Sequence, residues 1–177
     1  MDWPYNYVLP TDDPTINPND QCSIGSVVGT IGAAGSATWL NANLAIYVPF
    51  RLNHSIVAIN MFAFNGATAA TSTDLGVYDE YGVRLFHTGS TTQVTINSVT
   101  TIAITSTILG PGLFYMAMSQ SGSSSTYFRS ASLTAQFSKV VGIATQQTAH
   151  PLPTVAVFAT ASAAYIPMFG LTVRSFI

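Results

Sequence analysis

Charged side chains are scarce in this sequence. Only 12 of its 177 residues are Asp, Glu, Lys or Arg, or 7%, whereas about 25% is typical of a soluble globular chain. The five cations are scattered under a formal net charge of −2, which argues against a nucleic-acid binder, because phosphate contacts require clustered cations. A surface with few charges provides little electrostatic repulsion between copies of a protein. We therefore expect that neighbours in an assembly cover much of the surface. The alternative is a neutral, Ser- and Thr-coated monomer.

Cysteine is nearly absent as well. Cys22 is the single one, so the chain forms no internal disulfide. Asp20 is the nearest ionisable side chain and is not a base that activates a thiol, so we interpret Cys22 as structural or incidental. The opening residues lack the basic and apolar regions of a signal peptide, and export by that route is not expected.

An uncharged stretch near the end of the chain needs a separate test for a membrane span. Residues 154–173 carry no charge, but hydroxyl side chains dilute their apolar character, and the pattern breaks at Pro167 and Gly170. These features favour two buried strands joined by a turn over a transmembrane segment. We therefore expect no membrane association.

What the sequence does contain begins with an unusual first segment, residues 1–23. Four prolines recur there between acidic and amide residues, and neither a helix nor a central strand tolerates that spacing of proline. We predict an extended arm that lies along its own body or along a neighbouring chain, where its stiff backbone reduces the entropy cost of ordering. Its apolar side chains are the predicted partner-binding anchors: Trp3, Tyr5, Tyr7, Val8 and Leu9.

The remaining residues, 24–177, are predicted to form a single domain of β-strands. Strands are expected over 44–50, 55–64, 74–78 and 83–87, where apolar and β-branched residues alternate with turn residues. In 55–64 both alternating sets of side chains are largely apolar, which indicates a central strand of a sandwich. Further strands are expected over 99–106, 113–119, 127–137, 154–159 and 165–173, with a short helix within 130–137 as the competing interpretation.

Turn residues link these strands into an antiparallel arrangement. Asp79-Glu80-Tyr81-Gly82 predicts a hairpin turn, with Gly82 at a position that requires a positive φ. Strands 74–78 and 83–87 should therefore pair antiparallel. About eight strands at spacings near ten residues predict an all-β protein with an antiparallel β-sandwich of jelly-roll-like topology.

The residues that carry chemistry do not gather into a recognisable site. His54, His87 and His150 are far apart, and no two have the spacing of metal ligands, so we interpret them as surface or strand-end residues. The body's only acids surround the predicted hairpin: Asp74, Asp79 and Glu80. They have the oxygen chemistry to hold a hard cation such as Ca²⁺. An Asp-rich turn before a glycine also forms for backbone reasons alone, so no metal site is expected.

Signatures of catalysis are missing too. The chain has no G-x-S-x-G nucleophile elbow, and Gly110 and Gly112 do not form a phosphate loop because no helix pattern follows them. The alternative interpretation, an enzyme that degrades the cell envelope, is supported only by the three acids around the hairpin. We therefore predict no enzymatic activity and no cofactor.

Two segments resemble a module of structural proteins of tailed bacteriophages. Residues 74–85 (DLGVYDEYGVRL) resemble its apolar strand, acidic turn and second strand, and residues 108–119 (ILGPGLFYMAMS) resemble its Leu-x-Pro-Gly element before an aromatic strand. Tyr47-Val-Pro-Phe50 is similar to its opening. The resemblance covers roughly residues 44–120, and jelly-roll carbohydrate-binding modules share the same pattern of strands and turns.

The resemblance implies a virion component, assembled in the host cytoplasm. Because the chain lacks a fibrous shaft, the expectation is a capsid decoration or cement protein that binds the major capsid protein lattice without catalysis. Trimers are frequent in such families, so the resemblance implies a homo-oligomer, with a trimer as the guess. The alternative is a receptor- or glycan-binding module of a tail or fibre, with exposed Tyr127 and Phe128 and the loop 122–126 as contacts.

Overall fold

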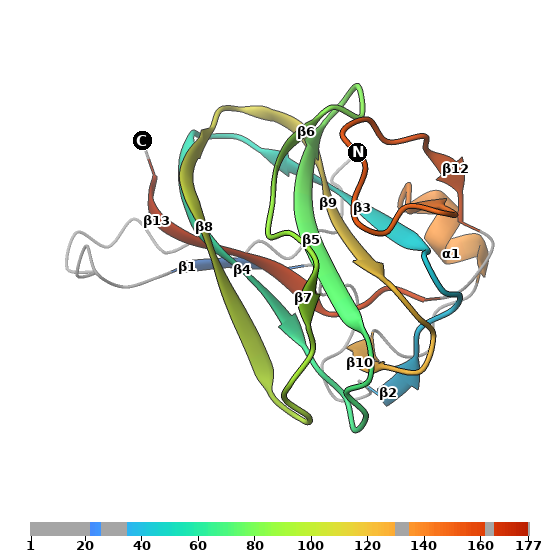
Figure 1. The fold of residues 1–177 in the computed structure, drawn as a ribbon. Helices are drawn as coiled ribbons and strands as arrows, with labels where there is room; N and C mark the ends of the chain where they lie inside the picture. Colours follow the sequence, from blue (N-terminus) through green and yellow to red (C-terminus); the bar gives the residue numbers. More distant parts are fainter. Residues whose placement is uncertain (1–21, 26–34, 130–134, 162–164, 177) are drawn as a thin grey trace.

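The computed structural model describes residues 22–25, 35–129, 135–161 and 165–176, which form antiparallel sheets packed against each other (Figure 1). One short helix accompanies the strands. The elements are β1 (Cys22–Gly25), β2 (Gly35–Thr38), β3 (Ala45–Leu52), β4 (Ile56–Phe64), β5 (Ser72–Asp79), β6 (Arg84–His87), β7 (Thr91–Thr92), β8 (Val99–Leu109), β9 (Gly112–Gln120), β10 (Thr126–Arg129), α1 (Ala135–Val140), β11 (Ala144–Gln146), β12 (Ala159–Thr160) and β13 (Phe169–Phe176).

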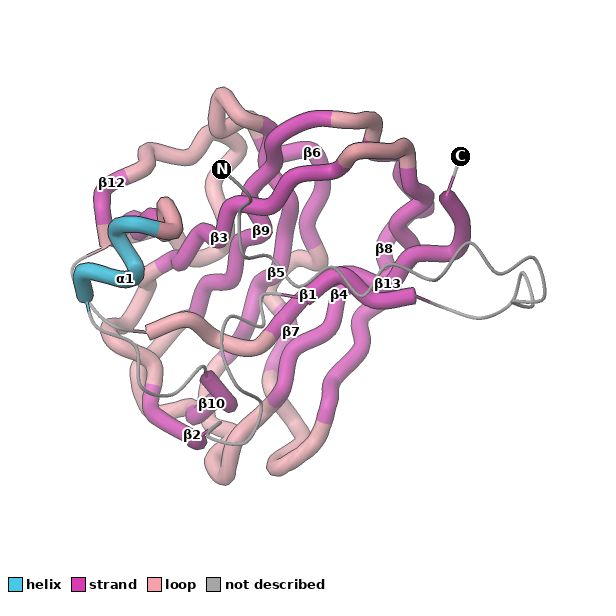
Figure 2. The backbone as a smooth tube through the Cα atoms, turned by 180° about the vertical axis from the view of Figure 1, so that it is seen from behind, coloured by secondary structure: helices cyan, strands magenta, loops and turns pink. Residues whose placement is uncertain are grey.

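Two sheets form the layers of the sandwich. The smaller sheet has the order β1-β13-β4-β8, and the larger has the order β12-β11-β3-β9-β5-β6, with β7 also paired to β5. β10 and β2 form a separate pair. Seen from behind, α1 lies at the β12 side of the molecule (Figure 2). The predicted all-β antiparallel sandwich is confirmed, whereas its jelly-roll topology stays a prediction.

The main core lies between the two sheets. β4 pairs with β13 on one side and β8 on the other, as its doubly apolar sequence predicted. Its side chains Ile56, Ala58, Met61 and Ala63 are buried. Trp39 belongs to this core, with its ring edge-to-face against two tyrosines and its indole N–H bonded to a backbone carbonyl. Alternation of side chains across each strand sends every second residue into this layer.

A second, smaller core covers the outer face of the larger sheet. There Tyr47, Tyr78 and Ala117 pack with residues that follow β11. We call residues 147–158 the strap, because they cross this face and contribute Ala149, Leu152 and Ala156 to its core. Aromatic side chains close the contact, with the rings of Tyr47 and Phe158 centred 5.1 Å apart. The strap therefore covers the outer face of the larger sheet over β3, β5 and β9.

The later strands differ from the sequence predictions. The strand predicted over 127–137 ends at Arg129, and α1 begins at Ala135, in line with the competing helical interpretation. Residues 154–158 are irregular, with one bridge at Val155, because they belong to the strap. β13 begins at Phe169, later than predicted, and contains Gly170 instead of breaking there. No helix among the described residues is long and apolar enough to cross a membrane.

Candidate functional site

The β5–β6 hairpin is built as the sequence predicted. The two strands pair antiparallel, and Gly82 takes a φ of +82°. The Asp79 carboxylate accepts hydrogen bonds from the backbone N–H groups of Tyr81 at 3.0 Å and Val83 at 2.8 Å. Asp79 thus uses its charge to hold the turn, as Asp side chains commonly do at such positions. The result is a rigid tip that projects from the sheet.

The strap lies alongside this hairpin. Val83 and Val155 form an antiparallel bridge, and backbone hydrogen bonds run from Arg84 N–H to Thr154 at 2.9 Å and from Ala156 N–H to Gly82 at 2.8 Å. This alignment covers the open edge of β6 with backbone from the strap. Covering an edge in this way removes unpaired N–H and C=O groups that would otherwise pair with another chain.

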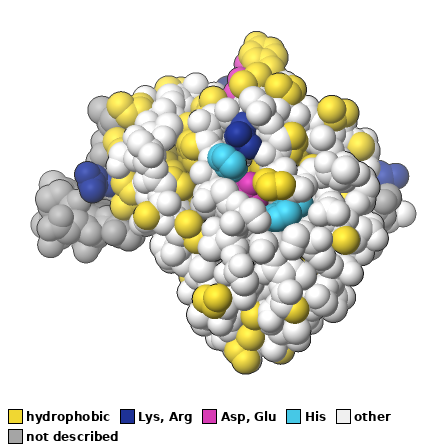
Figure 3. All heavy atoms as spheres, viewed as in Figure 1, with side chains coloured by type: hydrophobic (Ala, Val, Ile, Leu, Met, Phe, Trp, Pro, Cys, Tyr) yellow, Lys and Arg dark blue, Asp and Glu magenta, His cyan; other side chains and the backbone are white. Residues whose placement is uncertain are grey.

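One face of this hairpin–strap pair is apolar and exposed. The bridge places Val83 opposite Val155, and along each of the two segments side chains at alternate positions share a face. We call this surface the hairpin patch, and its residues, with their exposed fractions, are Tyr81 (80%), Val83 (43%), Leu85 (42%), Val155 (56%) and Val157 (68%). Figure 3 shows apolar side chains, in yellow, at the tip over the β5–β6 turn.

The structure also builds a polar cluster beneath the strap. Asp74 in β5 is completely buried, and its carboxylate accepts a hydrogen bond from Leu152 N–H at 3.0 Å and lies 2.9 Å from Nδ1 of His87. The Thr88 hydroxyl donates to the other carboxylate oxygen at 3.3 Å. Because Leu152 belongs to the strap, this buried acid ties the strap to the sheet.

His150 joins the same region of the surface. Its two ring nitrogens each lie 3.0 Å from a serine hydroxyl, Nδ1 from Ser119 and Nε2 from Ser90. Burial lowers the pKa of His150, and the nearby charge of Asp74 opposes that shift. Figure 3 shows histidine side chains, in cyan, near one another on this face, one of them beside a cationic side chain in dark blue. The sequence placed His87 and His150 far apart, and only the fold brings them together around one acid.

The cluster does not assemble the ligands of a metal site. Among the residues that the structure describes, no group of three or more His, Cys, Asp or Glu side chains is placed to hold a metal ion. Asp74 is committed to the strap, and Asp79 to the turn. The bonds of the cluster therefore account for how the strap is held.

Tyr127 does not occupy the surface position expected of a glycan contact. The expectation that its side chain is exposed is wrong: the ring is fully buried and lies edge-to-face against Trp39, with 5.8 Å between centroids. Its hydroxyl lies 2.5 Å from that of Thr73, accepts from the Gln120 amide at 2.5 Å and donates to Gln93 at 3.1 Å. Burial raises the pKa of Tyr127 to about 12. The neighbouring Phe128 is partly buried.

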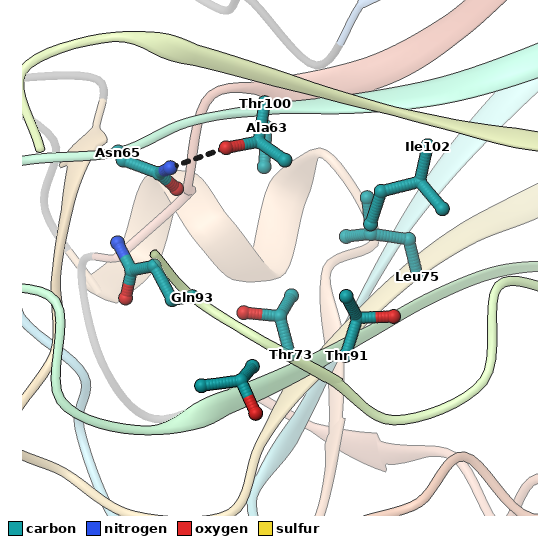
Figure 4. A pocket seen from close by; sticks show the side chains of 9 residues that line it. Ala63, Asn65, Thr73, Leu75, Thr91, Gln93, Thr100 and Ile102 are labelled. Carbon is teal, nitrogen blue, oxygen red and sulfur yellow. Dashed lines mark hydrogen bonds between the residues drawn. The ribbon is translucent and has the colours of Figure 1, made fainter. Parts of the chain in front are cut away.

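A small hollow adjoins this network, lined by side chains from β4, β5, β7 and β8 and from the residues next to them (Figure 4). Its volume is about 20 Å³, far less than that of the pockets that hold drug-sized ligands. Asn65 donates to the Thr100 hydroxyl at 2.6 Å on its wall. The Gln93 amide nitrogen, buried at another wall, has no hydrogen-bond partner within the described part of the chain.

The predicted anchors of the arm lie outside the described residues. These are Trp3, Tyr5, Tyr7, Val8 and Leu9, and their role stays a prediction. The sequence did not single out the hairpin patch, although it predicted the hairpin that carries three of its five residues. The alternation of valines at 155 and 157 was the available signal, and it was interpreted as part of a buried strand.

Comparison with known proteins provides no relative for this chain. No protein-family model matches it, and neither a curated protein nor a solved structure matches it.

Proposed function

We propose that this protein is a structural component of a bacteriophage virion, a capsid decoration or cement protein that binds the major capsid protein lattice without catalysis. The sequence resemblance over residues 44–120 supports the viral context. The scarcity of charge over the whole chain supports a protein that is in contact with other proteins in an assembly.

The observation that carries the proposal is the hairpin patch. Tyr81 is 80% exposed and Val157 68%, although both are side chains that a free monomer tends to bury. Apolar side chains gathered on one exposed surface mark contact sites. Burying the exposed part of one such valine contributes about 1 kcal/mol, from about 25 cal/mol per Å² of apolar surface. Burial of the whole patch would therefore contribute several such increments to the binding of a partner.

The patch is also held in place before any partner binds. The hairpin turn is fixed by Asp79, and the strap is fixed by Asp74 at Leu152 and by the Gln146 amide oxygen, which accepts from Val157 N–H at 2.9 Å. A rigid contact surface loses little conformational entropy on binding, so more of the burial energy appears as affinity. A protein that binds only the assembled shell then stabilises it by mass action.

Co-sedimentation with capsids that lack this protein tests the proposal. We expect the double variant Val155→Ser, Val157→Ser to lower the affinity for the capsid about tenfold or more, the equivalent of about 1.4 kcal/mol. The matched control is Val140→Ser, a 75% exposed valine on α1, which should bind as the wild type does. Equal binding by the double variant would refute the role of the patch.

Cryo-electron microscopy of the virion decides the location. Density for the chain on the capsid lattice supports the decoration protein. Density at the tail tip would overturn it in favour of the receptor- or glycan-binding alternative, for which Phe128 and the loop 122–126 remain as candidate contacts.

A further inference from the structure

β8 forms a long border of the smaller sheet. It is the last strand in the order β1-β13-β4-β8, and within the described residues its ladder is with β4 alone. In an antiparallel ladder every second residue directs its N–H and C=O groups away from the neighbouring strand. We call this outward side the β8 edge. Figure 1 shows β8 running along the side of the sandwich, in front of β4.

Most features that protect an edge from other chains are missing from β8. None of its eleven residues is charged and none is proline, although charges and prolines are the usual protection. One irregularity is present, where the register with β4 shifts between Ala58 and Asn60. From Val99 to Ala103 the register with β4 is regular. Along this half, Val99, Thr101 and Ala103 are exposed and uncharged.

The loop before β8 adds apolar side chains next to this half. Val94 is 79% exposed and Ile96 53%, and Val99 follows at 48%. The Asn65 amide holds the loop by donating to the hydroxyls of Thr95 at 2.9 Å and Thr100 at 2.6 Å. Two backbone hydrogen bonds of 2.8 Å also hold the loop. One runs from Asn65 N–H to the carbonyl of Ser98, and the other from Asn97 N–H to the carbonyl of Gly66. The apolar side chains are thus fixed beside the start of β8.

We propose that the β8 edge pairs antiparallel with the β8 edge of a second copy of this chain. A two-fold axis close to Thr101 would place β8 against itself and join two four-stranded sheets into one continuous sheet. The strand is self-complementary in this arrangement because it carries no charge to repel its own copy. The inference concerns the isolated protein and does not rest on its binding to a capsid.

Surface area explains why the loop is needed. A stable interface buries about 800 Å² on each partner, more than five residues of paired strand provide. The exposed side chains of Val94, Ile96 and Val99 supply the apolar surface that such a dimer requires beside the strand. Backbone pairing then sets the orientation, and the apolar contacts supply affinity, as in other complexes formed by strand addition.

Charge exchange at Thr101 tests the pairing directly. The side chain is exposed, so Lys or Glu should be tolerated in the folded chain. Next to a two-fold axis, like charges at this position face each other. In sedimentation-equilibrium analysis the wild type should reach twice 18.7 kDa, and Thr101→Lys and Thr101→Glu should each be monomeric. Their equimolar mixture should recover the dimer, because opposite charges then meet.

The control is Ser123→Lys, an exposed position in the loop between β9 and β10, which should remain a dimer. A monomeric wild type, a mass other than twice the chain, or a dimer that survives Thr101→Lys would each overturn the inference. Circular dichroism confirms that the variants are folded. As a second measurement, Thr101→Cys in a Cys22→Ser background should form an intermolecular disulfide on oxidation, whereas Ser123→Cys should not. Capsid co-sedimentation reads out the proposed function separately, so either proposal can fail alone.

Discussion

Removing the Asp74 carboxylate should weaken the attachment of the strap. The carboxylate is fully buried and receives hydrogen bonds from Leu152 N–H and Thr88, with His87 as its third partner. In Asp74→Ala the buried Leu152 N–H loses its acceptor, which costs about 1–3 kcal/mol. Loss of the contacts with His87 and Thr88 adds to this, while relief of the buried charge subtracts from it. We expect a net loss of about 3 kcal/mol in the free energy of unfolding.

Two further variants calibrate that value. Asp74→Asn keeps one oxygen for Leu152 N–H, so it should lose less, about 1–2 kcal/mol. Glu80→Gln changes an exposed acid in the same hairpin and should stay within about 0.5 kcal/mol of the wild type. Urea unfolding followed by tryptophan fluorescence measures these differences, because Trp39 is buried in the main core. A loss of about 3 kcal/mol is large against a total stability of about 5–15 kcal/mol.

A local readout separates the strap from the rest of the fold. Hydrogen exchange should become faster at the Leu152 amide in Asp74→Ala, while amides shared by β3 and β9 remain protected under native conditions. The reasoning is refuted if Asp74→Ala unfolds within about 0.5 kcal/mol of the wild type and Leu152 stays protected. Because the strap carries Val155 and Val157, its release should also weaken binding through the hairpin patch.

The remaining predictions concern pH and packing. Burial lowers the pKa of His150 in the folded chain below its ordinary 6.5, so on acidification the unfolded chain binds a proton before the folded chain does. The free energy of unfolding should therefore fall as pH drops below 6.5, and more steeply than in His150→Gln. Urea unfolding across a pH series measures this difference. A Cβ at Gly76 would lie 2.9 Å from the Phe86 carbonyl oxygen, so Gly76→Ala should lower the melting temperature through a loss of about 2 kcal/mol. Gly110→Ala, which meets nothing within 4 Å, is the control and should leave the melting temperature unchanged or slightly higher.

The elements that could be predicted are those set by local patterns. The β5–β6 hairpin follows from an acidic turn with Gly82 between two apolar segments, and β4 is central because both of its faces are apolar. Residues 154–158 have the alternation of a strand, but they pair with the hairpin through a single bridge at Val155 and form no longer ladder. Whether such a segment joins a sheet depends on which strand edges are available. The neighbouring sequence does not determine this availability.

The candidate site was harder to predict than the fold, because burial depends on distant partners. Tyr81 and Tyr127 are both tyrosines in strand-and-turn surroundings, yet one is 80% exposed and the other fully buried. Tyr127 is buried because Trp39, Thr73 and Gln120 surround it from other elements. The turn at 79–82 is consistent with an exposed Tyr81, but no local pattern predicts that Tyr127 is buried.

The sequence by itself determined the β architecture, its principal hairpin and the neutral character of the surface, because side-chain alternation, turn geometry and charge content are local or compositional properties. Only the tertiary structure decided the roles of individual polar groups. The sequence left Asp74 as a candidate cation ligand, whereas the structure shows it buried and attached to the strap. Its contacts there are with His87, 13 residues away, and Leu152, 78 residues away. The tertiary structure also left the valines of the hairpin patch and the β8 edge exposed, because exposure depends on where the rest of the chain packs.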